Sequence, residues 1–218
     1  MPQLDGQSPP AARRRGRPVG SDSAETRNTI LRAARQVINE RGYHAATFQA
    51  IAMAAGLSRP TLHYHFASRE EIYGMLVADA SGVIADCIGE AKRKDTFLEQ
   101  LAALIAAMQE ADVRDRSLIA FLVSARLEAT RDPELEVGLG NALRSFLRWS
   151  LCAAKSRGEL AADTAVVPIA DMLHAMLWGL GFHAGFDSQT DLSSIAKQLN
   201  GLLSHGLLGP ESVAAGHR

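Results

Sequence analysis

The stretch from residue 47 to residue 73 reads TFQAIAMAAGLSRPTLHYHFASREEIY, and it decides the fold. Apolar residues recur at helical spacing over residues 48–55, up to Gly56, which predicts a short helix that ends at a glycine. Ser58 can cap a following helix, because Pro60 is tolerated in a first turn where no amide partner is lost. Two short helices packed at a steep angle around a glycine-containing turn have the geometry of a helix-turn-helix.

The second of these short helices is predicted to expose a polar and aromatic face. Leu62 and Phe66 fall on its inward side. The other side chains combine hydrogen-bond donors, acceptors and aromatic rings, which suits a surface that reads the major groove of DNA. These side chains are Arg59, Thr61, His63, Tyr64 and His65. Spacing alone leaves a second interpretation open, because any cluster of three helices has a turn and a polar exposed face.

Helical signals continue on both sides of this pair. Upstream, an apolar face from Ile30 to Ile38 predicts a helix that stops near Gly42. Downstream, the sequence SREE at residues 68–71 reads as a capping box that opens a long helix. The short pair therefore lies between two longer predicted helices.

Residues 47–73 resemble the signature of the TetR family of transcription regulators. The matching features are a Thr before the first short helix, Ile-Ala followed by Ala-Gly, an apolar residue and Ser, then Thr-Leu, Tyr-x-Phe and a basic-Glu-Glu-apolar cap. The preceding helix fits as well, with its Ala-Ala pair and the sequence RGY at residues 41–43. The resemblance implies an all-α fold with an N-terminal three-helix DNA-binding head and a larger C-terminal helical domain for ligand binding and dimerisation. It also implies a bacterial homodimer that binds double-stranded operator DNA and acts as a repressor under the control of a small effector.

Carried over residue by residue, the resemblance implies a set of DNA contacts. The set is Thr47, Ser58, Arg59, Thr61, His63, Tyr64, His65 and Arg69. Thr47 is expected to hold a phosphate, residues 59–63 to approach base edges, and the next two residues to reach bases or backbone. Arg69, where the family usually has Lys, is expected to clamp a phosphate with a bidentate fork. The family more often has Tyr at the position of His63, so the base contact there is not assigned.

The N-terminal residues 1–22 are predicted to form a flexible arm with a second DNA-binding element. Its arginines are Arg13, Arg14, Arg15 and Arg17. The Arg-Gly-Arg-Pro core resembles an AT-hook, in which arginines enter a narrow A·T-rich minor groove. The alternative is a generic basic tail that adds only salt-sensitive attraction to phosphates.

The rest of the chain is predicted to be helical, with no strand alternation and no internal repeat. The expected helices cover residues 96–111, 113–130, 132–157, 165–186 and 190–208. The predicted domains are the arm at 1–22, the helix-turn-helix domain at 23–70, the effector-binding and dimerisation domain at 71–210, and a tail at 211–218.

The resemblance implies dimerisation through the last two long helices. The first of these helices offers a large side chain, Trp178, beside small residues that allow close approach, and the second offers a matching apolar stripe. The alternative interpretation is that these residues belong to the core of a single chain. The candidates are Trp178, Gly181, Ile195, Leu199 and Leu202.

The middle helices are expected to enclose an effector pocket. Apolar candidates predominate, which favours a hydrophobic or lipid-like effector, although core filler is the more common role for each of them. Asp171 and His174 form a polar pair that must be satisfied by neighbours, water or a ligand. The candidates are Phe97, Met108, Phe121, Trp149, Asp171, Met172, His174, Met176 and Phe182.

Composition bears on other classes of protein. The chain has 218 residues, of which ten basic and six acidic ones lie in residues 1–75, so the front carries net positive charge. Residues 166–186 approach the length of a membrane span, but Asp171, His174 and His183 would be costly in lipid. The N-terminus lacks the apolar stretch of a signal peptide, so a cytoplasmic protein with no membrane partner is expected.

Three other functions compete with that of an operator-binding regulator. An enzyme is not favoured, because no paired carboxylates, nucleophile elbow, metal-ligand spacing or phosphate loop is visible, and no cofactor or metal is expected. An architectural DNA binder that uses mainly the arm would bind random DNA almost as well as an operator. A redox sensor would need Cys87 or Cys152, which are expected to be buried, inert thiols without a resolving partner.

Overall fold

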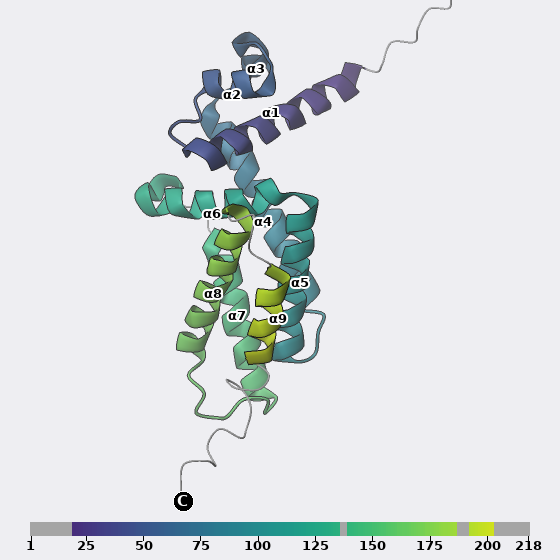
Figure 1. Ribbon diagram of the computed structural model, residues 1–218, viewed down its shortest axis with the longest axis vertical. Helices are drawn as coiled ribbons and strands as arrows, with labels where there is room; N and C mark the ends of the chain where they lie inside the picture. Colours follow the sequence, from purple (N-terminus) through teal and green to yellow (C-terminus); the bar gives the residue numbers. More distant parts are fainter. Residues whose placement is uncertain (1–18, 136–138, 187–191, 203–218) are drawn as a thin grey trace, which may run out of the picture.

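The computed structural model describes residues 19–135, 139–186 and 192–202, and these residues are all-α (Figure 1). The segments are α1 (Val19–Arg41), α2 (Phe48–Ala55), α3 (Arg59–His65), α4 (Arg69–Ala91), α5 (Phe97–Arg114), α6 (Arg116–Arg131), the short 3-10 helix η1 (Pro133–Leu135), α7 (Leu139–Ser156), α8 (Val166–Phe186) and α9 (Leu192–Leu202).

The head consists of α1, α2, α3 and the beginning of α4, and it lies at one end of the molecule (Figure 1). Thr47 caps α2 by accepting a hydrogen bond from the Ala50 amide, and Ser58 caps α3 in the same way from Thr61. Gly56 ends α2 with φ of 67°, a left-handed conformation that glycine adopts without steric cost. Local signals in the sequence therefore set both short helices and the turn between them.

The body is a bundle of α4 to α9, and α4 runs from the head into it (Figure 1). Phe97, Phe121 and Leu147 are almost fully buried at its centre. Truncating a buried phenylalanine of this kind to alanine typically costs ~3–5 kcal/mol. The body thus has a hydrophobic core large enough to hold the helices in fixed positions.

Helices α6 and α8 make a close approach at Gly185. A Cβ atom added at Gly185 would lie 2.7 Å from the Cα of Ala120 on α6. One turn earlier, a Cβ at Gly181 would lie 3.7 Å from the Val123 side chain. The absence of a side chain at Gly185 therefore permits this crossing.

Several predicted boundaries differ from the structure. Helix α1 begins at Val19, inside the predicted arm. The helix expected from residue 132 is divided: η1 follows Asp132, whose carboxylate accepts from the Glu134 amide, and α7 begins only at Leu139. Asp115 ends α5 and caps α6 by accepting from Ser117, which moves that boundary from residue 112 to residue 115. The side chains of Asp132 and Asp115 accept backbone hydrogen bonds at the two interior breaks.

Among the described helices, α4 is the one whose length and composition would suit a membrane span. From the sequence, residues 166–186 approach the length of a span but carry polar residues that argue against one. In the structure α4 buries Ile72, Leu76, Ala80 and Ile84 within the fold. Its apolar composition is therefore explained by its place in the core.

Candidate functional site

Helix α3 presents its polar face at the surface of the head. Leu62 and Phe66 are buried at 0% and 1% exposure, as predicted, and they fix the orientation of the helix. Tyr64 is 83% exposed, and Arg59 also lies in solvent. A tyrosine this exposed on a rigid, capped helix is available to contact a partner.

The two histidines of α3 have different surroundings. The ring of His63 is exposed and packs on Phe48 of α2, with 4.5 Å between the ring centroids. His65 is half-buried beside Tyr64, and its carbonyl accepts a hydrogen bond from Arg27. Of the two imidazoles, His63 is thus the better placed to face a groove.

Arg27 is a head residue that the sequence did not single out. Its guanidinium lies 4.2 Å from the centroid of the Phe66 ring, and it donates to the carbonyl of His65. Cation–π contact and charge-assisted hydrogen bonding both tie α1 to the end of α3. No sequence motif signals this contact, because 38 residues separate Arg27 from His65.

The predicted phosphate contacts, Thr47 and Arg69, lie at the starts of α2 and α4. The Thr47 hydroxyl accepts from the Ala50 amide at 3.2 Å, so its oxygen already caps the helix. The Arg69 guanidinium lies 4.2 Å from the centroid of the Tyr43 ring and 3.3 Å from Oε1 of Glu70. Hydrogen bonding to its own backbone amide is the main cause that lowers the pKa of Glu70, and Arg69 adds to it. Arg69 is therefore held near the head surface, with a carboxylate as its partner.

The arginines of the predicted arm lie outside the described residues.

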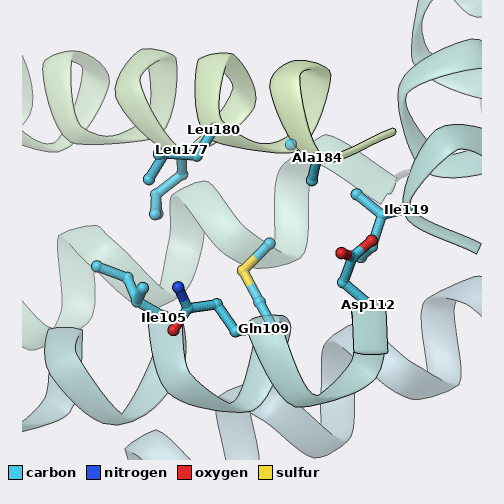
Figure 2. Close-up of a pocket in the computed structure, with 9 residues that line it drawn as sticks. Ile105, Gln109, Asp112, Ile119, Leu177, Leu180 and Ala184 are labelled. Atoms are coloured by element: carbon cyan, nitrogen blue, oxygen red, sulfur yellow. The ribbon is translucent and has the colours of Figure 1, made fainter. Parts of the chain in front are cut away.

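A cavity of about 40 Å³ lies between α5, α6 and α8 (Figure 2). Its lining is apolar apart from Gln109 and Asp112. A second cavity of about 30 Å³ adjoins it and also reaches α4, α7 and Trp178. Both are lined by Met108, Ile119, Leu177 and Gly181.

The predicted pocket residues lie in several places, and of the nine only Met108 lines these cavities. Phe97 and Phe121 belong to the core, and Met176 is half-buried against it. Trp149 is 47% exposed, with the Lys92 ammonium 5.2 Å from its ring centroid. The remaining two apolar candidates, Met172 and Phe182, lie on the exposed face of α8.

The polar pair on α8 is satisfied by neighbours. Asp171 accepts two hydrogen bonds from Arg144 of α7, at 2.7 and 2.8 Å. These bonds to Arg144 lower the pKa of Asp171. His174 accepts from the indole nitrogen of Trp178 at 2.8 Å. The sequence left open whether neighbouring side chains or a ligand satisfy Asp171 and His174. These contacts match the interpretation in which neighbouring side chains do so.

The predicted dimer residues divide between core and surface. Leu199 is buried, Gly181 packs against Val123 of the same chain, and Trp178 is half-buried. Ile195 and Leu202 of α9 are exposed, at 38% and 59%.

An apolar stripe that the prediction missed lies on α8 and consists of Met172, Ala175, Gly179, Phe182 and Phe186, all exposed. Their spacing of three and four residues puts them on one face of the helix. The sequence could not identify this face, because α8 is apolar on most sides.

Buried polar contacts join the head to both ends of α6. On α1, Arg35 places Nη2 2.9 Å from Oδ2 of Asp115, the N-cap of α6, and 8% of its side chain is exposed. Towards the other end of α6, the buried Glu128 accepts from the amide of Tyr43 at 3.3 Å. The Asn39 side chain also donates to the carbonyl of Ser117 at 2.9 Å. Because α6 also lines both cavities, one helix contacts the head and the cavities.

The cysteines are free in the structure and occupy different environments. Cys87 is buried, and burial raises the pKa of its thiol, with Glu90 and Asp86 adding to the effect. Cys152 is exposed, so the expectation that both thiols are buried was wrong for this one. Its position on the outward side of α7 is the reason. Within the described ranges, no group of three or more His, Cys, Asp or Glu side chains could hold a metal ion.

A helix-turn-helix head on an all-helical body defines a class of DNA-binding transcription regulators. Comparisons with known proteins agree with this class. Residues 30–75 match the family described as bacterial regulatory proteins, tetR family. The chain is 29% identical over 169 residues to the HTH-type transcriptional repressor BepR of Brucella suis biovar 1 (strain 1330), with 73% of this chain and 80% of BepR covered. It is 30% identical over 166 residues to the HTH-type transcriptional repressor AcnR of Corynebacterium efficiens, with 73% of this chain and 79% of AcnR covered.

A solved structure supports the same fold. The fatty acid degradation regulator FadR from Bacillus halodurans aligns with a TM-score of 0.68 and 22% identity, over 84% of this chain and 96% of that one. The chain belongs to the TetR family, and its relatives are bacterial DNA-binding transcriptional regulators.

Proposed function

We propose that this chain is an operator-binding homodimer that represses transcription and releases DNA when a small effector enters the cavity between α5, α6 and α8. The observation that carries the proposal is the double role of α6. Its residues Ile119, Leu122 and Val123 line the two cavities, while its ends hold the head through Asp115 and Glu128. A ligand that displaced α6 would therefore act on the head directly.

The two cavities are small in this structure. We therefore interpret the structure as the effector-free state, in which the body is closed and the protein can bind DNA. A ligand of ordinary size needs several hundred Å³, so its entry requires Met108 or α8 to move. Methionine is unbranched and adapts readily to a changed cavity. An effector that binds only the expanded state would shift the population towards it. Effector binding would act on the head through α6 as well as through α4, which runs from the head into the body (Figure 1).

On the DNA side, we propose that Arg59, Thr61 and His63 approach base edges while Tyr64 reaches bases or backbone. Ser58, Thr47 and Arg69 would lie at phosphates, and His65 would act mainly by anchoring α3 through its carbonyl. For Arg69 to clamp a phosphate, its guanidinium must exchange Glu70 for the DNA backbone, which keeps a charge-assisted partner in both states. The predicted arm, with Arg13, Arg14, Arg15 and Arg17, would add minor-groove contacts.

Dimerisation is proposed to use the exposed stripe on α8 together with Ile195 and Leu202 of α9. Apolar side chains exposed in a row on two adjacent C-terminal helices suit a self-complementary two-fold interface. A dimer would place two copies of α3 on successive half-sites about one helical turn of DNA apart.

We further propose that the head ends near residue 70, that residues 71–210 form the effector and dimer domain, and that the protein acts in the cytoplasm.

The test is operator binding by the purified full-length chain. Fluorescence anisotropy would measure its affinity for DNA from upstream of its own gene against excess random DNA, at a stated salt concentration because affinity depends on salt. Tyr64→Ala and Arg59→Ala should each weaken specific binding by about tenfold or more. Arg93→Ala, at an exposed site beyond the end of α4, is the matched control. Equal affinity for random DNA would reject an operator-specific regulator, and transcription raised by the bound protein would reject repression.

A further inference from the structure

The cavity between α5 and α8 has a polar end formed by Asp112. Oδ1 of this carboxylate is buried and has no hydrogen-bond partner in the described part of the chain. Figure 2 shows the carboxylate on α5 directed towards α8, beside Ile119 and Ala184. Burial raises the pKa of Asp112, and nearby Arg116 opposes this effect. A buried acceptor without a donor is unusual in a folded protein and calls for an explanation.

The remaining lining supplies no positive charge. Gln109 contributes an amide one turn before Asp112, and the other described lining residues are Ile105, Met108, Ile119, Leu177, Leu180, Gly181 and Ala184. Arg116 lies outside this lining, is exposed, and directs Nε to the carbonyl of Ala184 at 3.4 Å. The cavity therefore combines an apolar chamber with one negative end.

This arrangement discriminates between classes of ligand. A carboxylate ligand would bring a second negative charge next to Asp112 without a cation in the lining to balance it. A neutral alcohol could donate one hydrogen bond but would bring no opposite charge to the carboxylate. An ammonium group would satisfy both needs, because it donates hydrogen bonds and carries the opposite charge.

We propose that the effector is an amine with an aliphatic or otherwise apolar body, whose ammonium group binds Asp112 and whose body extends past Met108. The inference rests on the proposed function, in that it takes this cavity to be the effector site. Movement of Met108, which lines both cavities, would join them into one chamber for the apolar body. This differs from the lipid-like effector that the sequence favoured, because the amine needs the buried carboxylate as well as the apolar walls.

The experiment compares three probes with the same ten-carbon chain: decylamine, decanol and decanoate. Isothermal titration calorimetry on the full-length protein, below the concentrations at which the probes aggregate, would give each affinity. Decylamine should bind at least about tenfold more tightly than either of the others. Asp112→Asn, which keeps the shape and removes the charge, should abolish this preference. Glu110→Gln, at an exposed carboxylate on the same helix and outside this cavity, should retain it.

Two results would overturn the inference: decanol or decanoate binding as tightly as decylamine, or an unchanged preference in Asp112→Asn. A thermal melt of Asp112→Asn without ligand checks its fold, and we expect a Tm close to that of the wild type because the two side chains have nearly the same shape. The operator assay separates the two proposals. Asp112-dependent binding of decylamine with no loss of operator binding would refute effector release and uphold the ligand class. Equal release of the operator by decanol and decylamine would uphold effector release and refute the preference for an amine.

Discussion

Arg35 of α1 and Asp115 at the start of α6 form an ion pair across the junction between head and body, with 2.9 Å between Nη2 and Oδ2. The Arg35 side chain is 8% exposed, whereas that of Asp115 is 42% exposed. Asp115 also accepts from the amide and hydroxyl of Ser117, so one carboxylate both starts α6 and holds α1. Removing the arginine leaves Asp115 with its capping role, which allows the two functions to be separated.

Arg35→Met should lower the free energy of unfolding and weaken the coupling between effector and operator. The pair is buried on one side only, so we expect a loss of ~1–3 kcal/mol, below the cost of breaking a fully buried pair. Urea unfolding would measure the loss, and operator binding with and without decylamine would measure the coupling. Arg32→Met, at an exposed position one turn earlier, is the control and should leave both quantities unchanged. A coupling as strong as in the wild type would show that this pair is structural only.

Gly42→Ala should be more destabilising than Gly158→Ala, although both glycines have nearly the same backbone conformation. Their φ angles are 81° and 80°, so each substitution strains a left-handed residue by ~1–2 kcal/mol. At Gly158 an added Cβ meets nothing within 4 Å, whereas at Gly42 it would lie 2.7 Å from Oε1 of Glu128. The added methyl must therefore push Glu128 away from the Tyr43 amide. Thermal melts of the two variants give the comparison, and equal losses of stability would mean that Glu128 moves aside freely.

The head could be predicted from the sequence because its signals are local. Ser58 and Gly56 set the ends of the short helices, and Leu62 and Phe66 are the residues that the helical period turns inward. Arg27 escaped prediction because its partner lies far along the chain. Local chemistry thus determines which face of α3 is free, while long-range contacts determine how firmly it is held.

The cavity could not be predicted, because α8 is apolar on most of its surface and periodicity does not identify the inward face. Leu177 and Leu180 line the cavity, while Met172 and Phe182 face solvent. For the same reason the sequence singles out Asp171 and His174 as the polar pair and does not indicate that Asp112 lines a cavity. Arg144 on α7 satisfies Asp171, whereas Oδ1 of Asp112 on α5 is buried without a hydrogen-bond partner in the described part of the chain.

Gly185→Ala should destabilise the fold, whereas Gly82→Ala should stabilise it. Both glycines lie within helices, where alanine is favoured by ~1 kcal/mol. An added Cβ at Gly82 meets open space, but at Gly185 it would lie 2.7 Å from the backbone of Ala120, which cannot rotate away as a side chain could. We expect a net loss of ~1–3 kcal/mol at Gly185, the usual cost of overpacking. Chemical denaturation of both variants would measure the difference. A stabilised Gly185→Ala would mean that α8 shifts relative to α6 at little cost, which would itself favour a cavity that expands easily.

Phe182→Lys should convert the dimer to monomer and lower operator affinity without unfolding the chain. Phe182 is 49% exposed in the single chain, so the substitution removes little packing there, but it would put a charge within the proposed stripe. Analytical ultracentrifugation measures the assembly state, circular dichroism checks helix content, and anisotropy measures operator binding. The control is Val113→Lys, at an apolar residue 87% exposed near the end of α5 and away from the stripe. A Phe182→Lys protein that remained a dimer with full operator affinity would move the interface to another face. A monomer that still bound the operator tightly would instead remove the requirement for two recognition helices on one site.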